Sequence, residues 1–411
     1  MSRDNLYAYY REALQGRPLP LAFVDLDRFD ANTKAILARA QETPICVASK
    51  SIRCVGLLKR ILGASPRFQS IMAYSLREAV FLATQGCDNI LVAYPVLSEV
   101  AARLSHAPQD AFSFRTIFDA LRANRTIRLM VDCEAHVSNL EEYGARESVV
   151  VPVCIDLDMS TSFPGLYFGV RRSPVRTGEQ ALALWRCIQE CPHVRLDGVM
   201  GYEAQIAGVQ DSAPRARLKS AIIRRLKKRS LPQVRARRAA VVKALREAGA
   251  RLQFVNGGGT GSIESTIEEH NVVTEVTVGS GFYAPGLFDH YARFRHQPAA
   301  GFALEITRRP APNVFTCHGG GYIASGPAGS DRLPSIWLPE GAALLPLEGA
   351  GEVQTPVHYE GPEKLELGSP VFLRHAKAGE LCERFNTLVL ISEGRIVDEI
   401  PTYRGNGLAF V

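Results

Sequence analysis

A long hydrophobic run is absent from this chain of 411 residues, in which no stretch of about eighteen uncharged apolar residues occurs. The absence predicts that no helix spans a membrane, and we expect no membrane partner. The first residues also lack the apolar centre that a signal peptide requires. The protein is therefore expected to be cytoplasmic.

Cysteine pairs of the C-x-x-C type are absent as well, although the chain has nine cysteines. The odd number and the scattered positions predict reduced cysteines that are buried as small apolar side chains. The histidines His136, His193 and His358 have no spacing that argues for chemistry. The cysteine pattern therefore predicts no zinc cluster.

Basic charge is concentrated in one segment. The net charge is +6, yet residues 215–251 contain fourteen Lys or Arg and a single acid, Glu247. Apolar residues recur there at spacings of three, four and seven, and Pro232 interrupts them, which predicts two amphipathic helices with solvated basic outer faces. Interleaved aromatic residues for stacking on bases are missing, so nucleic acid is not an expected partner. A docking surface for an acidic partner or a polyanion is the alternative.

Length and composition indicate two domains, because 411 residues exceed one compact core and 46% of them are hydrophobic. In the first 285 residues, apolar runs alternate with helical patterns, which predicts a (β/α)8 barrel. The eight runs are residues 21–26, 44–49, 70–74, 89–94, 127–132, 149–156, 196–202 and 252–256. After about residue 294, short β-like runs between Gly and Pro predict a mostly β domain. The expected fold is α/β, with a barrel over residues 1–290 and a β-rich domain over residues 291–411.

Many of the eight runs end in a side chain that can do chemistry, and barrel active sites are built at that end of the strands. These residues are Asp25, Lys50, Tyr74, Tyr94, Asp132, Asp156, Tyr202 and Asn256. Lys50 follows a predicted buried strand, so its side chain is expected to point into a pocket.

A glycine-rich element, Asn256 to Ser262, lies about two hundred residues after Lys50. It follows a predicted strand and precedes a predicted helix start, so its bare N–H groups and the helix N-terminus favour an anion. Because a lysine can bind an aldehyde, the two elements together predict an aldehyde phosphate cofactor.

These elements resemble the fold-type III pyridoxal phosphate (PLP) enzymes, in which an alanine-racemase-like barrel precedes a β domain. Within that group they resemble the D-threonine aldolase and D-serine dehydratase branch. The resemblance covers nearly the whole chain. It rests on residues 20–27 with Asn32, the strand ending in Lys50, Asn256 to Ser262, Thr274 to Ser280, and Phe372 to His375.

The resemblance implies a role for each matching residue. Lys50 would hold PLP as a Schiff base and then act as the catalytic base, and Tyr202 would lie near the cofactor ring. Tyr167 stands where the family usually has an arginine as the partner of the pyridine nitrogen, and a phenol is a weaker partner. The phosphate would be bound by Gly258, Gly259, Thr260 and Gly261.

The sequence departs from the family at its metal site, a His-x-Asp or His-x-Cys pair that polarises the β-oxygen of the substrate. His375 keeps the first position, but Lys377 takes the second, and a protonated amine cannot ligate a metal. One hypothesis is that Lys377 supplies the positive charge itself and makes the enzyme metal-independent. A second keeps a divalent metal on His375 and recruits Cys382, Glu380 or His318. In the simplest alternative, His375 is a hydrogen-bonded structural histidine.

Residues and resemblance together predict a PLP-dependent lyase that acts on a D-β-hydroxy amino acid. Retro-aldol cleavage and dehydration with deamination both stay open, because the sequence does not orient the bond that breaks. In a dehydratase, Lys377 is a candidate acid for the leaving hydroxide. The catalytic residues are expected to be Lys50, His375 and Lys377.

Two other functions fit part of the pattern. An amino-acid racemase on the same scaffold needs a second base, for which Tyr322 is available but is not in a recognisable racemase context. A non-catalytic PLP carrier usually ends after the barrel, so the additional domain argues against it.

The family resemblance also implies a head-to-tail homodimer in which the second domain of one chain completes the active site of the other. The substrate is expected to be a small amino acid. Arg171, Arg172 and Arg176 follow the Tyr167 region and are candidates for holding an extra substrate carboxylate, although a solvated loop explains them equally well.

Overall fold

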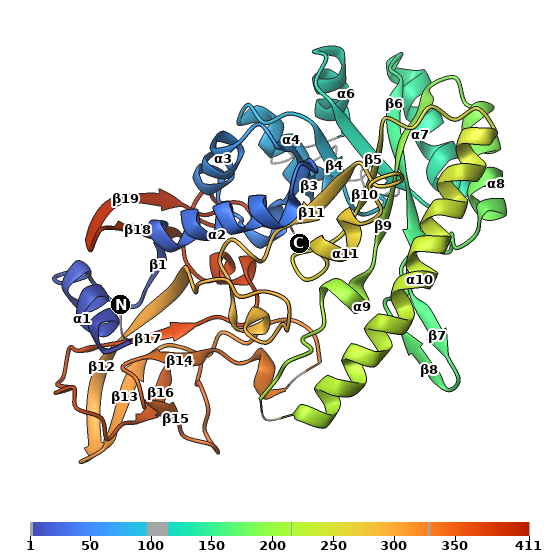
Figure 1. Cartoon of the computed structure of the whole chain (residues 1–411). Helices are drawn as coiled ribbons and strands as arrows, with labels where there is room; N and C mark the ends of the chain where they lie inside the picture. Colours follow the sequence, from blue (N-terminus) through green and yellow to red (C-terminus); the bar gives the residue numbers. More distant parts are fainter. Residues whose placement is uncertain (1–2, 97–113, 215, 328, 411) are drawn as a thin grey trace. The chain divides into compact units, whose positions relative to one another are not determined.

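The computed structural model describes residues 3–96, 114–214, 216–327 and 329–410 and contains two compact units (Figure 1). The barrel unit consists of Ile36–Lys50, Arg60–Gly279 and Phe410–Val411. The sheet unit consists of Met1–Ala35, Ser51–Lys59 and Ser280–Ala409. The division of the chain into domains near residue 290 stays a prediction.

Eight parallel strands close the barrel, which confirms the predicted α/β fold class. Around the barrel each strand pairs with its neighbour in parallel register. The strands are β2 (Ile45–Ala48), β3 (Phe68–Ala73), β4 (Ile90–Val92), β5 (Ile127–Val131), β6 (Val151–Asp158), β9 (Val194–Tyr202), β10 (Phe254–Gly257) and β11 (Glu275–Val278).

The barrel core is built from apolar side chains of neighbouring strands. Leu91, Met130, Cys154 and Met200 form a buried cluster, and Phe254 packs against it. Strands β2 and β6 are buried along their whole length, as expected for parallel strands that are covered on both faces.

One glycine in the barrel is required by this packing. A Cβ atom on Gly198 of β9 would lie 2.4 Å from the ring of Phe254, so only glycine lets that aromatic ring lie against the strand.

The predicted choice of barrel strands is wrong at one place. Strand β1 (Leu21–Asp25), predicted to be the first barrel strand, pairs instead with strands of the sheet unit, and β11 is the eighth strand of the barrel. The error has a physical cause. A strand at the centre of a covered sheet is buried on both faces, like a barrel strand, so hydrophobicity cannot distinguish them. Strand β11 was not predicted as a barrel strand because its first residue is a glutamate, Glu275, which interrupts the apolar pattern.

Helices surround the barrel strands, as Figure 1 shows for α4, α6, α7, α8 and α10. Helix α8 begins with a capping box, in which Thr177 and Gln180 satisfy each other's backbone N–H groups. The described helices of the barrel unit are α4 (Leu76–Thr84), α6 (Phe114–Arg122), α7 (Glu134–Glu147), α8 (Gly178–Gln189), α9 (Ala204–Ala207), α10 (Arg217–Glu247) and α11 (Ile263–Ile267). A short hairpin joins β7 (Thr161–Phe163) to β8 (Leu166–Phe168).

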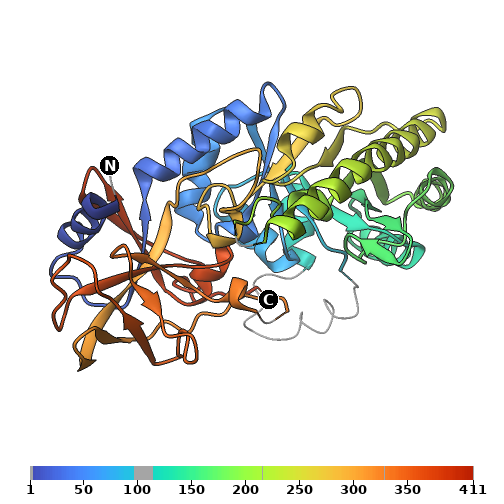
Figure 2. The ribbon, with the colours of Figure 1, turned by 60° about the horizontal axis from the view of Figure 1, so that its bottom comes forward.

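The basic segment forms one continuous helix, so the prediction of two helices separated at Pro232 is wrong. Helix α10 runs for 31 residues with Pro232 inside it, and Figure 2 shows it as a single rod beside the barrel. Its buried residues include Val234, Val241 and Leu245, which pack on the barrel side. This apolar stripe continues past the proline, and burying it stabilises the helix against the hydrogen bond that proline removes.

The sheet unit contains a nine-stranded, mostly antiparallel sheet in which β1 lies between β12 and β18. The described strands of this sheet besides β1 are β12 (Ala300–Ala311), β13 (Val314–His318), β14 (Ser335–Leu338), β15 (Ala343–Leu344), β16 (Gln354–His358), β17 (Pro370–Arg374), β18 (Thr387–Ser392) and β19 (Arg395–Pro401). The unit also contains helix α1 (Arg3–Ala13), and helices α2 (Leu26–Ala40) and α3 (Val55–Ala64) contribute residues to both units.

Aromatic side chains form the centre of the sheet unit. Phe23 of β1 contacts the rings of Tyr10, Trp337 and Phe372, with centroid separations of 4.9 to 6.2 Å. Such pairs contribute roughly 0.5–1.5 kcal/mol each beyond the area they bury. None of the helices in the described parts of the chain combines the length and the hydrophobicity that a bilayer span requires.

Candidate active site

Lys50 lies directly after β2, in a short 3-10 turn (Ser49–Ser51) at the carboxyl end of the barrel strands. Its Nζ donates a hydrogen bond to the hydroxyl of Tyr94, 3.1 Å away. Tyr94 follows β4, so the barrel brings together two residues that are 44 positions apart. The Lys50 side chain is exposed, and its amine is therefore accessible to a ligand.

The phenol of Tyr94 is in a positive environment. Burial raises its pKa, but the ammonium of Lys50 and the guanidinium of Arg172 lower it by more, and the net shift is downward. The guanidinium carbon of Arg172 lies 5.9 Å from the centre of the Tyr94 ring. Tyr94 is thereby prepared to release a proton more readily than an ordinary tyrosine.

A pocket lies at the carboxyl ends of β4, β6 and β9. Its polar lining consists of Tyr94, Asp156, Asp158, Arg172, Ser173 and Tyr202. This is the end of the barrel where (β/α)8 enzymes place their active sites.

Asp156 gives this pocket an unusual carboxyl group. Burial, followed by the charge of the nearby Asp132, raises the pKa of Asp156 to about 7. A carboxyl group with this pKa can take up or release a proton near neutral pH, which suits general acid–base chemistry.

The glycine-rich element forms a tight turn between β10 and α11. Gly258 has a φ of +85°, which favours glycine, and its N–H donates to the buried carboxylate of Glu203 at 3.2 Å. The Gly259 N–H donates to the hydroxyl of Ser262 at 3.1 Å. Two of the four predicted phosphate-binding residues therefore have their N–H groups engaged within the barrel unit.

The remaining backbone groups of the turn are those of Thr260 and Gly261. The Gly261 N–H has no hydrogen-bond partner among the described residues. Arg39 donates to the carbonyl of Thr260 at 2.7 Å and pairs with Glu264 of α11. The side chain of Arg39, on helix α2, therefore holds the turn in place.

A buried charge network supports the turn. Arg238 of α10, with 0% of its side chain exposed, pairs with Glu203 at 2.8 Å and with Glu269 at 2.6 Å. Glu203 in turn accepts hydrogen bonds from the hydroxyl groups of Ser262 and Thr266. This network was not predicted, although Arg238 follows Val234 by four residues and so falls on the apolar face of the helix.

Tyr202 lies against the glycine turn. A Cβ atom on Gly259 would come within 2.8 Å of Ala207 and 3.2 Å of the Tyr202 ring. Burial raises the pKa of Tyr202 to about 12, so this phenol stays protonated at neutral pH.

Tyr167, the predicted partner of the pyridine nitrogen, has its hydroxyl engaged in its own loop. The hydroxyl donates toward Asp158 and the Val170 carbonyl, each at 3.2 Å, and accepts from Ser160 at 2.6 Å. The guanidinium of Arg171 stacks 4.0 Å above the ring. Of the three candidate arginines, Arg172 lines the pocket, and Arg176 pairs with Asp158.

His375 and Lys377 belong to the sheet unit. His375 follows β17 and is 3% exposed, and neither of its ring nitrogens has a hydrogen-bond partner among the described residues. Burial and the adjacent Arg374 lower its pKa to about 3, so the ring is neutral. The alternative of a hydrogen-bonded structural histidine stays a prediction.

The side chains near His375 do not complete the metal pair of the family. Lys377 donates to the Ser325 hydroxyl at 2.7 Å and lies 3.8 Å from the Glu380 carboxylate. The Cys382 thiol donates to a backbone carbonyl, that of Ile52, at 3.3 Å. An ammonium in the second position does not fit a cation.

Tyr322, the residue named for the racemase alternative, packs between aromatic rings. Its ring lies 4.9 Å from that of Phe302 and 5.4 Å from that of Phe385, and burial raises its pKa. His318 ends β13 with an exposed side chain.

The fold and the pocket define a (β/α)8-barrel protein with a lysine at the carboxyl end of a strand and a glycine turn after another. The model of the alanine racemase N-terminal domain family matches residues 24–285. The chain therefore belongs to this family, and the predicted class of fold-type III PLP enzymes is confirmed.

Solved structures share the fold at low sequence identity. D-threonine aldolase from Filomicrobium marinum is 17% identical, with a TM-score of 0.76 over 94% of this chain and 95% of that one. D-threo-3-hydroxyaspartate dehydratase from Delftia sp. HT23 is 18% identical, with a TM-score of 0.74 over 95% and 98% of the two chains. Alanine racemase from Bacillus anthracis is 16% identical, with a TM-score of 0.61 over 95% and 100%. No curated protein matches the chain significantly.

The residues of the barrel unit fit PLP. Lys50 offers an accessible amine, the Gly261 N–H offers a donor without a partner among the described residues, and a side chain at Gly259 would clash with Ala207. A phosphate at such a turn is stabilised by backbone N–H groups.

Proposed function

We propose that the protein is a PLP-dependent lyase that acts on a D-β-hydroxy amino acid. The observation that carries this proposal is the contact between the Lys50 amine and the Tyr94 hydroxyl at the mouth of the barrel. PLP, when bound, would supply an electron sink for the bond that breaks at the α-carbon of the substrate. The neighbours of known fold include an aldolase and a dehydratase for D-configured substrates, which supports this substrate class.

Each residue of the proposed site would then have its own role in binding or proton transfer. Lys50 would bind the cofactor aldehyde and move a proton at the α-carbon or the β-hydroxyl. Tyr94 lies within hydrogen-bond distance of Lys50 and has a lowered pKa, so it can exchange a proton with the amine. Gly258, Gly259, Thr260 and Gly261 form the turn that would hold the phosphate, and Tyr202 would pack on the cofactor ring.

Arg172 would hold a carboxylate of the substrate, because it is the one of the three candidate arginines that lines the pocket. Its positive charge beside Tyr94 also favours an anion there. Tyr167 is a weaker candidate for the pyridine nitrogen than the sequence predicted, because Asp158 and Val170 engage its hydroxyl.

Lys377 would supply positive charge at the β-oxygen of the substrate in place of a metal, while His375 stays neutral beside it. The charge at this position supports the proposal, since a divalent cation and an ammonium can both stabilise a developing oxyanion. The reaction would then proceed without a metal at His375.

Product analysis on the purified holoenzyme tests the function. D- and L-β-hydroxy amino acids are supplied, with and without chelator. Glycine with an aldehyde, or a keto acid with ammonia, is expected from D-substrates only. The rates are expected to be the same with and without the chelator. Loss of optical rotation without either product would instead indicate a racemase, and binding of amino acids without turnover would indicate a carrier.

The cofactor lysine has its own control. Borohydride reduction followed by peptide mapping is expected to leave the cofactor on Lys50. Lys50→Ala is expected to abolish both the label and the turnover, whereas Lys59→Ala, at an exposed lysine of helix α3, is expected to leave both intact. A label on another lysine would contradict the assignment.

A further inference from the structure

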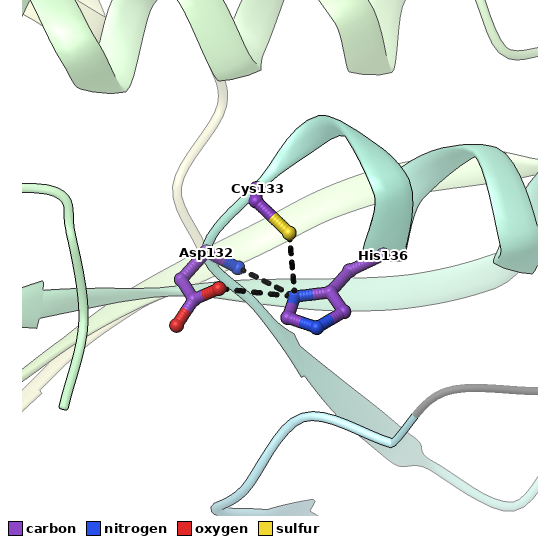
Figure 3. Close-up of side chains that lie close together, drawn as sticks. All are labelled: Asp132, Cys133 and His136. Carbon is purple, nitrogen blue, oxygen red and sulfur yellow. Dashed lines mark hydrogen bonds and ion pairs between the residues drawn. The ribbon is translucent and has the colours of Figure 1, made fainter.

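Three potential ligand side chains converge beside β5 in the barrel unit, outside the pocket described above. Asp132 follows the last residue of β5, Cys133 precedes α7, and His136 lies in the first turn of that helix. Figure 3 shows the carboxylate and the thiol both directed at the Nδ1 atom of His136. The Nδ1 atom is 3.0 Å from the Asp132 Oδ1 and 3.3 Å from the Cys133 Sγ.

The hydrogen bonds around this Nδ1 atom conflict with one another. The Asp132 carboxylate can only accept, so it requires a hydrogen on Nδ1, whereas the Asp132 backbone N–H, 3.3 Å away, requires the lone pair of the same atom. A single nitrogen cannot satisfy both partners. A cation between the three side chains removes the need for a hydrogen on Nδ1, because nitrogen, oxygen and sulfur then all act as ligands, and only the weak hydrogen bond from the Asp132 N–H is given up.

We propose that Asp132, Cys133 and His136 bind a zinc ion, with water as the fourth ligand. One imidazole nitrogen, one thiolate and one carboxylate oxygen form a donor set that suits zinc. Tetrahedral zinc with bonds of roughly 2.0 to 2.3 Å holds its ligand atoms roughly 3.3 to 3.6 Å apart. The three ligand atoms lie within 4.8 Å of one another, so small side-chain rotations bring them to this geometry.

The surroundings let an ion enter. The three residues are half-buried, and Asp132 and Cys133 line a cavity together with Glu134 and Gln180. Cys133 stands at the N-cap position of α7, but its side chain makes no cap hydrogen bond and its sulfur is directed at His136 instead. None of the three residues lines the pocket of Tyr94 and Arg172, although Asp132 lies near Asp156 of that pocket.

Binding has a defined proton balance. The Cys133 thiol loses its proton as the Zn–S bond forms, and that proton passes to the buffer. No bond to carbon changes and no electron is transferred. The site does not depend on the proposed lyase activity, so either proposal can fail without the other.

Cobalt substitution of the holoenzyme tests the site. Cobalt(II) alone is added to the His375→Ala variant with Cys133 intact, since this substitution removes the other candidate ligand. One equivalent is expected to bind with the visible absorption of tetrahedral cobalt and a sulfur-to-cobalt charge-transfer band. Cys133→Ala is expected to lose that band and to weaken zinc binding by at least about 100-fold. Cys191→Ala, which removes another half-buried thiol, is expected to change neither.

A second measurement needs no variant at the site. Zinc is expected to slow alkylation of Cys133 in the wild-type protein and to leave the rate at Cys191 unchanged, as followed by peptide mass spectrometry. Equal alkylation of Cys133 with and without zinc would overturn the proposal. An octahedral cobalt spectrum, or the same zinc affinity in Cys133→Ala and wild type, would overturn it as well.

Discussion

The carboxyl group of Asp156 shows how one buried residue can connect stability to pH. Its pKa is raised to about 7 from the ordinary value of 3.8, so the folded state binds this proton more tightly than the unfolded state does. Stability is therefore lost as pH rises from about 4 to about 7, and the loss is constant above that range. The full penalty is about 4 kcal/mol.

Asp156→Asn is expected to remove this penalty. The variant should gain stability relative to wild type, by roughly 2 to 3 kcal/mol more at pH 8 than at pH 5. Urea unfolding of the cofactor-free proteins at both pH values measures the difference. The same gain at pH 5 and pH 8 would show that the pKa of Asp156 is not raised.

His375 and Lys377 allow a test of the charge replacement. Lys377→Asp restores the family's His-x-Asp pair beside an imidazole whose nitrogens have no partner among the described residues. We expect the variant to bind one more equivalent of manganese than wild type, measured by electron paramagnetic resonance. Its turnover is expected to be lost when a chelator is added.

Lys377→Ala serves as the control, because it removes the ammonium without adding a ligand. It should bind no additional manganese and should lose turnover. If Lys377→Asp also binds none, His375 does not face a site that a metal can occupy.

At the scale of elements, helix α10 positions the glycine turn through Arg238. The guanidinium neutralises two carboxylates, Glu203 of the β9–α9 connection and Glu269 after α11, and Glu203 holds the Gly258 N–H. One long helix thus connects to the loops after two barrel strands.

Arg238→Met is expected to destabilise the protein by about 3–5 kcal/mol, because it leaves two carboxylates without their buried partner. Chemical denaturation followed by circular dichroism measures the change. Arg235→Ala on the same helix removes an exposed pair with Glu268 and is expected to cost at most about 1 kcal/mol. Equal losses in the two variants would mean that the buried network contributes no special stability.

At the scale of the whole molecule, we expect a homodimer whose active sites combine residues of both chains. Light scattering should then give about twice the chain mass of 45.0 kDa. Lys50→Ala and Lys377→Ala should each be inactive alone. After unfolding and refolding together, the mixture should recover about a quarter of wild-type activity, because half of the dimers are mixed and each has one intact site.

Dimers without recovered activity would show that each chain completes its own site. A monomeric mass with full activity would contradict both parts of the expectation. Separate refolding of each variant is the control for spontaneous reactivation.

Much of the fold could be predicted because it depends on local patterns of apolar and polar residues. Alternating apolar runs and helical spacing predicted the barrel and the β-rich remainder, where the structure has the strands β12 to β19. The positions of Lys50 and the glycine turn at strand ends could also be predicted, since their residue types and neighbours are typical of such places. The family assignment followed from the order of these elements.

The sequence by itself therefore determined the class of fold and the family and predicted the cofactor residues, because these depend on residue types and patterns that are local in the chain. Only the tertiary structure decided which strand closes the barrel, since β1 and β11 differ in their hydrogen-bonding partners and not in burial. It also placed Arg238 between two distant carboxylates and turned Asp132 and Cys133 toward His136. These contacts depend on side-chain direction and on segments that fold together from far apart, which no local periodicity records.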